Sequence, residues 1–242
     1  MSGIKVRIQR QDGPKEKPYA QIFLYKGDVK VPVTTMLQNL NRQENLKDIE
    51  GREARPVKWE CSCEQGLCGS CAMVVNGKPG LGCQIFCHEA LDKNREISIL
   101  PLSKFPVIQD LMIDRTEMFE SMKKMKLWLE HPARIEKKQV PFQYEVSQCL
   151  MCGCCLEVCP NYHPGDLFLG APAAAAAVKL MEQEKGEAER KQLKKNYNRH
   201  VYKGCVKSLA CQDICPMHIP TGTAISKMNR LSVWTLWNLF QK

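Results

Sequence analysis

The chain has 242 residues, of which 44% are hydrophobic and 25% are charged, a composition typical of a globular protein with one or two domains. It contains no run of eighteen or more apolar residues, so the sequence predicts no membrane-spanning helix. The formal net charge of +9 suggests an anionic partner, but that figure treats all 14 cysteines as neutral thiols.

The N-terminal residues predict a β-hairpin. Residues 4–8 alternate apolar and polar side chains, as in a half-buried strand, and residues 19–27 form a second candidate strand after the turn-forming pair Gly13-Pro14. The same N-terminus lacks the apolar core of a signal peptide, which predicts a protein of the reducing cytoplasm.

One helix and further strands are expected next. A threonine, Thr34 or Thr35, is expected to cap a short helix that continues to Leu40. Asn76-Gly77 predicts a tight turn between two strands, and residues 96–100 alternate as a last strand. The first hundred residues are therefore predicted to form a small α+β domain.

From Phe105 onward the apolar residues recur at helical spacing. The pattern includes a methionine-rich stripe and predicts a helix over residues 108–129. Pro172 is expected in the first turn of a later helix, and the Lys/Glu-rich residues 182–199 are expected to form a solvated face. We place the domain boundary near residue 105, with domains 1–105 and 106–242, and expect the second domain to be mostly helical.

The cysteines form three clusters whose spacing fits neither a disulfide framework nor paired CxxC zinc sites. The first cluster reads C-x₄-C-x₂-C with a fourth cysteine downstream, which is the plant-type pattern for a [2Fe–2S] cluster. Its predicted ligands are Cys63, Cys68, Cys71 and Cys83. Gly66 and Gly69 allow this loop to fold tightly around inorganic sulfides, which accept hydrogen bonds from backbone N–H groups.

The second cluster, at residues 149–160, is the bacterial-ferredoxin run C-x₂-C-x₂-C-x₃-C-P. In that run the fourth cysteine ligates a different cluster, so the first three need a partner from the later motif. A [4Fe–4S] site is therefore predicted, with the ligands Cys149, Cys152, Cys155 and Cys215.

The third cluster repeats the second but has a serine in place of one cysteine. The remaining thiols are Cys159, Cys205 and Cys211, and Ser208 stands where a fourth ligand would lie. Three thiolates without a fourth are the requirement for a [3Fe–4S] cluster, which this spacing predicts. The alternative is a serine alkoxide that holds a fourth iron, although its harder oxygen suits ferrous iron less well than thiolate.

Three cysteines remain outside these sets, and buried structural thiols are the simpler interpretation for Cys61, Cys87 and Cys154. Each oxidised cluster, counted with its thiolates, adds about −2, so three clusters would lower the formal charge to roughly +3. The basic excess is therefore expected to balance the cofactors, and no nucleic-acid partner is predicted.

The order of these motifs closely resembles that of the iron–sulfur subunits of succinate dehydrogenase and quinol:fumarate reductase. The resemblance covers nearly the whole chain and rests on the stretches CEQGLCGSC, CLMCGCCLEVCP and ACQDICPMHIP. It implies an α+β fold with an N-terminal β-grasp [2Fe–2S] ferredoxin domain and an α-helical dicluster ferredoxin domain. It also implies two partners: a flavoprotein subunit with FAD, and a membrane anchor that binds quinone at the cytoplasmic face of the plasma membrane.

Under this resemblance the chain relays single electrons between FAD and quinone and supplies no catalytic residue of its own. Asn161 and Val206 stand where many ubiquinone-linked relatives have tryptophan and histidine. This difference favours menaquinone-linked members whose anchor is a dihaem cytochrome b. The candidate quinone contacts are Tyr162, His163 and His218, and packing around a cluster or the anchor is the alternative.

The C-terminal residues Leu231, Trp234, Trp237 and Phe240 would share one stripe, suited either to the membrane anchor or to the domain core. Two other functions remain open from the sequence. One is an iron–sulfur subunit of a soluble flavoprotein complex that passes electrons to thiols or disulfides. The other is an interaction protein organised by zinc.

Overall fold

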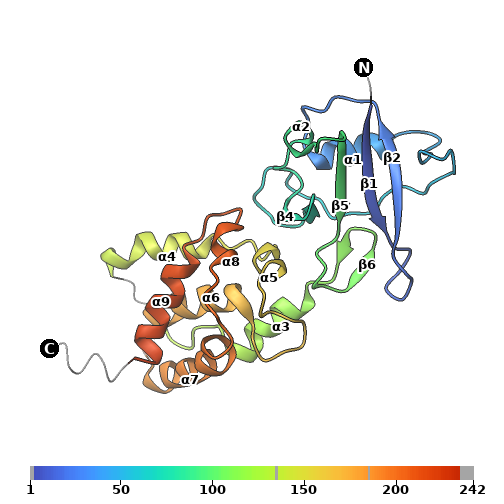
Figure 1. Ribbon diagram of the computed structural model, residues 1–242. Coiled ribbons are helices and arrows are strands. Elements are labelled where there is room, and N and C mark those ends of the chain that lie inside the picture. Colours follow the sequence, from blue (N-terminus) through green and yellow to red (C-terminus); the bar gives the residue numbers. More distant parts are fainter. Residues whose placement is uncertain (1–2, 134–135, 185, 235–242) are drawn as a thin grey trace. The chain divides into compact units, whose positions relative to one another are not determined.

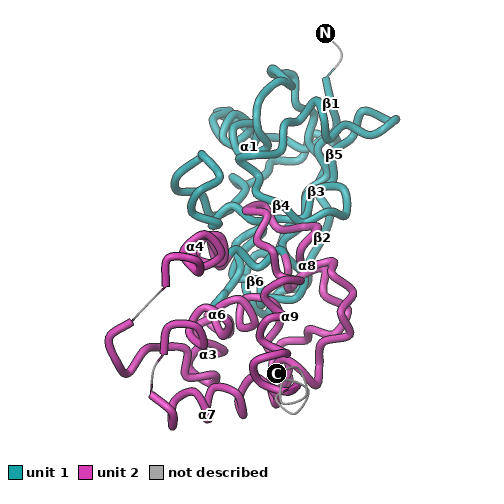
Figure 2. Tube along the Cα trace, turned by 90° about the vertical axis from the view of Figure 1, so that its left-hand side faces the viewer, with its two compact units in different colours: residues 1–115, 152–154 teal, residues 116–151, 155–242 magenta. Residues whose placement is uncertain are grey.

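The computed structural model describes residues 3–133, 136–184 and 186–234, and the chain divides into two compact units (Figures 1 and 2). Unit 1 comprises residues 1–115 together with 152–154, and unit 2 comprises residues 116–151 and 155–242. The domain limits 1–105 and 106–242 stay a prediction, since the structural division follows contacts and takes three residues of the ferredoxin run into unit 1.

Unit 1 is built on a five-stranded sheet with the strand order β2-β1-β5-β3-β4. Its elements are β1 (Ile4–Arg10), β2 (Tyr19–Tyr25), α1 (Val33–Asn41), β3 (Ala72–Val75), β4 (Lys78–Leu81), α2 (Cys87–Ala90), β5 (Glu96–Leu100), β6 (Val107–Gln109) and β7 (Met112–Ile113). Strand β1 pairs parallel with β5, and the other pairs are antiparallel. A mixed sheet of this order, with α1 in its core, agrees with the expected β-grasp fold.

The apolar residues that alternate in the sequence of β1 lie in the core of unit 1. Ile4, Val6 and Ile8 are fully buried, and β1 pairs with β2 as the predicted hairpin. At the predicted tight turn, Asn76 and Gly77 both have positive φ, 48° and 78°, as a two-residue turn between antiparallel strands requires. These strand predictions are confirmed.

The expected threonine cap of the first helix is wrong. Helix α1 begins at Val33 after Pro32 and has no side-chain cap. Instead, the Val33 and Thr34 N–H groups donate to the carbonyls of Ile85 and Gly82. Backbone from a neighbouring loop therefore satisfies the helix start, and a hydroxyl is not needed.

The helix predicted over residues 108–129 is also wrong in its first part. The chain forms the short hairpin β6–β7 there, and helix α3 covers only Thr116–Met125. Asp110, between the two strands, has a φ of 50°, which no right-handed helix accommodates. Its buried carboxylate accepts hydrogen bonds from Arg10 Nε at 3.0 Å and Arg55 Nη1 at 2.7 Å, so a polar network outweighs the apolar periodicity.

Unit 2 is helical, as predicted. Its elements are α3, η1 (Lys137–Gln139), α4 (Val140–Ser147), α5 (Cys154–Glu157, of which Cys154 belongs to unit 1), α6 (Gly170–Gln183), α7 (Glu187–Tyr197), the π-helical turn η2 (Asn198–Tyr202), α8 (Ala210–Asp213) and α9 (Thr221–Ser232). Helix α6 is central and contacts α3, α4, α7 and α9. Ala173, Ala174 and Ala177 are fully buried in it, and their small side chains admit close approach of its neighbours.

The Lys/Glu-rich segment has one buried side. Leu193 and Tyr197 of α7 belong to the core of unit 2, whereas the charged residues of this helix are exposed (Glu187, Lys191 and Lys195) or half-buried (Glu189, Arg190 and Lys194). Glu184 is an exception, because it is buried and accepts a hydrogen bond from the Glu130 N–H. Pro172 lies in the first turn of α6, as predicted.

Candidate metal centres

The first cysteine set lies around the β3–β4 hairpin of unit 1. Because Ala72 is paired with Leu81, the hairpin brings Cys71, before β3, to Cys83, after β4, with 3.3 Å between their sulfur atoms. The loop that precedes β3 carries Cys63 and Cys68. All four predicted [2Fe–2S] ligands are therefore in one region of unit 1.

Backbone N–H groups of this loop point at the thiols. Gly66 N lies 3.2 Å from Cys83 Sγ, and Leu67 N lies 3.3 Å from Cys63 Sγ. Gly66 and Gly69 have φ of 75° and 78°, and a Cβ at Gly66 would meet the Gln84 side chain at 2.9 Å. A four-thiol donor set with N–H donors directed at its sulfurs fits the chemistry of an iron–sulfur cluster.

Two cysteines of this set have very different environments in the apoprotein. The Ser70 hydroxyl, 2.9 Å from Cys68 Sγ, lowers the pKa of Cys68 to about 6. Burial raises the pKa of Cys71 to about 12. Iron deprotonates a coordinating thiol outright, so the lasting contribution of Ser70 is a hydrogen-bond donor to a ligand sulfur.

Arg115 holds the first part of the ferredoxin run within unit 1. Its guanidinium donates to the Ser70 carbonyl at 3.1 Å and to the Cys152 carbonyl at 3.3 Å, and it also pairs with Glu60. Hydrogen bonding to Cys154 lowers the pKa of Cys152 to about 7. One arginine thus contacts the backbone of a residue between two predicted [2Fe–2S] ligands and that of a predicted [4Fe–4S] ligand.

The other three cysteines predicted for the [4Fe–4S] site belong to unit 2. Cys149 and Cys215 pack against the core of that unit, and Cys155 lies in the short helix α5. This ligand set, with Cys152 as its fourth member, stays a prediction.

The third predicted site coincides with a small cavity of unit 2. Cys159, Cys205 and Cys211 line it together with Ser208, and the rest of its wall is largely apolar. Burial raises the pKa of Cys211, and the charges of Cys159 and Cys205 act in the same direction. The structure thus brings together three thiols and one hydroxyl from two distant segments, a donor set that fits a three-iron cluster.

Backbone strain surrounds the serine of this cavity. Lys207 and Leu209, on either side of Ser208, both have positive φ, 59° and 60°. Such conformations cost side-chain-bearing residues free energy and persist where the surrounding structure enforces them. The loop is therefore shaped to present residue 208 at the cavity.

Two of the three remaining cysteines are buried, as predicted, but Cys61 is not. Cys87 is fully buried in the core of unit 1, and burial raises its pKa to about 12. Cys154 is also fully buried, whereas Cys61 is partly exposed and its Sγ lies 3.7 Å from Glu64 Oε1.

The predicted quinone contacts differ in exposure. Tyr162 is buried, and burial raises its pKa, whereas His163 and His218 are exposed. Of the C-terminal stripe, Trp234 is described and exposed, while Trp237 and Phe240 lie outside the described residues. The roles of these residues stay predictions.

Sequence spacing found the cysteines but missed the residues that support them. The Arg115 guanidinium donates to the Cys152 carbonyl, and the Ser70 hydroxyl contacts Cys68 Sγ. No periodicity or motif in the sequence marks such contacts. The one available signal for Ser70 was its place between two ligand positions.

Comparison with known proteins agrees with both units. A family model described as a 2Fe-2S iron-sulfur cluster binding domain matches residues 5–120, and one described as a 4Fe-4S dicluster domain matches residues 145–219. The succinate dehydrogenase iron–sulfur subunit of Bacillus subtilis is 32% identical over 94% of this chain and 91% of its own length. The fumarate reductase iron–sulfur subunit of Wolinella succinogenes is 31% identical over 73% of this chain and 78% of its own length.

Among solved structures, the Mycobacterium smegmatis Sdh1 complex in the apo form contains a chain of the same fold. The TM-score is 0.75 at 20% sequence identity, with 95% of each chain covered. The order of a ferredoxin-like α+β domain and a helical dicluster domain is thereby confirmed.

Proposed function

The chain belongs to the family of iron–sulfur subunits of succinate dehydrogenases and fumarate reductases, and we propose that it relays single electrons between FAD and quinone. The FAD is held by a flavoprotein partner, and the quinone lies at a membrane anchor. The relatives favour this function over the soluble thiol-linked alternative, and the iron–sulfur family models argue against a zinc-organised protein.

Three ligand sets hold the clusters in this proposal. The [2Fe–2S] ligands are Cys63, Cys68, Cys71 and Cys83; the [4Fe–4S] ligands are Cys149, Cys152, Cys155 and Cys215; and the [3Fe–4S] ligands are Cys159, Cys205 and Cys211. Bound clusters supply one-electron redox chemistry whose potential depends on cluster type, charge and hydrogen bonds to sulfur. This chain's residues bind them, direct donors such as Gly66 N and Ser70 Oγ at ligand sulfurs, and enclose the three-thiol cavity largely with apolar side chains.

The three-thiol cavity is the single observation that carries the proposal furthest. A cluster with one ligand fewer loses a corner iron, and Ser208 occupies the position of the absent thiol at that cavity. The [3Fe–4S] centre is the one we assign to the quinone end of the relay, with Tyr162, His163 and His218 as quinone-contact candidates. Menaquinone and a dihaem cytochrome b anchor are the partners that the residues Asn161 and Val206 favour.

The chain acts as a peripheral subunit at the cytoplasmic face of the plasma membrane in this proposal. Across the part of the chain that the structure describes, no helix has both the length and the apolar character needed to cross a bilayer. The proposal assigns attachment to the membrane to the anchor subunit.

The test is spectroscopy and catalysis on the purified chain and on its complex. Oxidised protein should give the EPR signal of a three-iron centre, and reduced protein should give the signals of the other two. The chain alone should not oxidise succinate or reduce fumarate, whereas the complex with its flavoprotein should. Succinate oxidation by the chain alone, or a cluster-free chain in an active complex, would contradict the proposal.

A further inference from the structure

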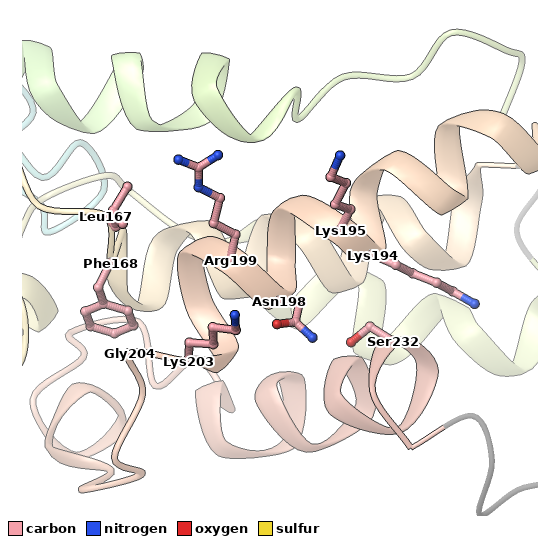
Figure 3. Close-up of a pocket in the computed structure, with 9 residues that line it drawn as sticks. All are labelled: Leu167, Phe168, Lys194, Lys195, Asn198, Arg199, Lys203, Gly204 and Ser232. Atoms are coloured by element: carbon pink, nitrogen blue, oxygen red, sulfur yellow. The ribbon is translucent and has the colours of Figure 1, made fainter.

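A basic groove runs along the surface of unit 2 between α7, η2 and the end of α9 (Figure 3). Its polar lining consists of Lys194, Lys195, Asn198, Arg199, Lys203 and Ser232. Figure 3 shows Lys195 and Arg199 on one side of the helix, while Asn198 lies on the side that faces Ser232. The volume of about 750 Å³ is far above that of a water molecule, so the groove admits a polyatomic anion.

The cations of this groove form no ion pair with another described residue. Within residues 3–133, 136–184 and 186–234, no salt bridge involves Lys194, Lys195, Arg199 or Lys203, and no acidic residue lines the groove. The sequence explains this, because residues 190–212 contain seven lysines and arginines and neither aspartate nor glutamate. By contrast, Lys123 and Lys124 of α3 each pair with a glutamate.

Exposed apolar side chains border the same surface. Leu167, which is 60% exposed, lines the groove, and Val206, which is 63% exposed, lines the neighbouring three-thiol cavity. Phe168 lines both, and Gly204 of the groove is directly followed by Cys205 of the cavity, so the groove and the cavity adjoin. Trp234 is exposed as well, with Lys207 Nζ 5.9 Å from its ring centroid. Lysine, arginine and tryptophan beside exposed aliphatic residues are typical of the interface between a membrane and water.

We propose that this groove binds the phosphate of anionic phospholipid headgroups. Lysine and arginine attract an anionic bilayer surface, and their N–H groups donate charge-assisted hydrogen bonds to phosphate oxygens. The Asn198 amide, on the groove wall, supplies a further donor, while Leu167 and Val206 can contact the upper acyl region. The inference rests on the proposed membrane-bound function and adds to it a direct contact between this chain and lipid.

The test measures binding of the full chain, loaded with its clusters, to vesicles that contain no protein. One set of vesicles is phosphatidylcholine alone, and the other also contains phosphatidylglycerol. The groove variant replaces Lys194, Lys195, Arg199 and Lys203 with glutamine. The control variant replaces Lys26, Lys30, Lys78 and Lys93, which are exposed on unit 1, and it loses the same net charge.

Wild type should bind the anionic vesicles and release them as salt is raised. The groove variant should lose at least about tenfold in binding, and the control variant less than about threefold. Equal losses in the two variants, or equal binding of wild type to both kinds of vesicle, would overturn the proposal. The proposal would also be overturned if the groove lysines and arginine supported binding only to vesicles that contain the anchor subunit. In that case the groove would bind a protein and not a lipid.

A soluble ligand is tested by titrating inorganic phosphate without vesicles. Saturable phosphate binding that the four groove substitutions abolish would contradict the lipid assignment, and its absence supports it. EPR spectra of the same samples separate this proposal from the proposed function. Missing clusters in the wild type would count against the proposed electron relay. The proposal that the groove binds phospholipid depends only on the vesicle measurements.

Discussion

At the scale of the residue, Ser208 is the side chain on which the predicted number of irons at its site depends. It lines the cavity with Cys159, Cys205 and Cys211, and the strained residues Lys207 and Leu209 fix its place. Replacing a hydroxyl with a thiol changes one atom at this point, so the ligand chemistry can be altered with little change in volume.

We expect Ser208→Cys to convert the three-iron centre to [4Fe–4S]. The added thiolate and fourth iron should lower the reduction potential, and about 59 mV corresponds to a tenfold change in the equilibrium of a one-electron couple. A reduction potential lowered by several multiples of this value should slow turnover with quinone in at least one direction. Activity with a dye that accepts electrons earlier in the relay should fall less.

The measurement is EPR of the oxidised wild type and variant, with redox titration of each. Ser226→Cys adds a thiol on the exposed side of α9 and serves as the control, with the three-iron signal retained. A wild type that has full iron content but lacks the three-iron signal would show that Ser208 is itself a ligand.

At the scale of the element, the β6–β7 hairpin shows how a polar contact overrides an apolar pattern. Arg10 is fully buried, and its guanidinium donates to Asp110, to Gln21 and to the Arg55 carbonyl. Asp110 is fully buried as well and also accepts from the Lys58 N–H at 2.9 Å. The hairpin therefore closes over an ion pair that helical periodicity could not reveal.

We expect Asp110→Asn to destabilise unit 1 by about 3–5 kcal/mol, because it leaves the buried Arg10 without its charged partner. Urea unfolding followed by Trp59 fluorescence measures the change. Glu44→Gln removes the same charge from an exposed position and should change the free energy of unfolding by less than about 0.5 kcal/mol. Equal stability of the two variants would show that the ion pair contributes nothing.

The same pair predicts a dependence on pH. Burial alone raises the pKa of Asp110, but hydrogen bonds from Arg55 and Arg10 outweigh it and hold this pKa below its usual value. A carboxyl whose pKa is lowered by folding stabilises the folded state fully at any pH above its unfolded-state pKa of about 3.9. This stability is lost as the pH falls through the folded-state pKa. The difference between wild type and Asp110→Asn should thus be equal at pH 7 and pH 5 and shrink only below about pH 4.

At the scale of the whole molecule, the two units do not follow the chain in order. Residues 152–154 belong to unit 1 although the residues on both sides belong to unit 2. Arg115 holds this segment through the Cys152 carbonyl and connects it to Glu60 and Ser70. The buried Phe105 also contributes, because its ring would lie 2.9 Å from a Cβ at Gly153.

We expect Arg115→Met to loosen this segment. Hydrogen bonds from a charged group contribute about 1.5–3 kcal/mol, so amide exchange at residues 153–155 should accelerate by roughly 10- to 100-fold. Arg115→Lys keeps the charge without the planar set of donors and should give a smaller change. Arg7→Met, which breaks an exposed pair with Glu96, is the control and should leave these amides unchanged. Unchanged exchange in Arg115→Met would mean that packing alone holds the segment.

Much of this architecture could be predicted from local pattern. Alternation revealed β1, β2 and β5, and cysteine spacing revealed the three clusters of thiols, because ligand geometry constrains neighbours in the chain. The features that could not be predicted depend on partners far away in the sequence. The start of α1 depends on the Ile85 carbonyl, the β6–β7 hairpin depends on Arg10, and the position of Cys152 depends on Arg115. The basic groove was hidden for another reason, since lysines on a helix also suit plain solvent exposure.

The hydrogen bond from Arg115 to the Cys152 carbonyl also has a consequence for the order in which the contacts of Arg115 form during synthesis. These residues are 37 positions apart, which at ribosomal rates of about 5–20 residues per second is a delay of roughly 2–7 seconds. In that interval Arg115 can already bind Glu60 and the Ser70 carbonyl, while its third partner has yet to emerge. The loop with the four predicted [2Fe–2S] ligands can thus be complete while most predicted ligands of the later sites await translation, so iron is expected to enter the N-terminal site first.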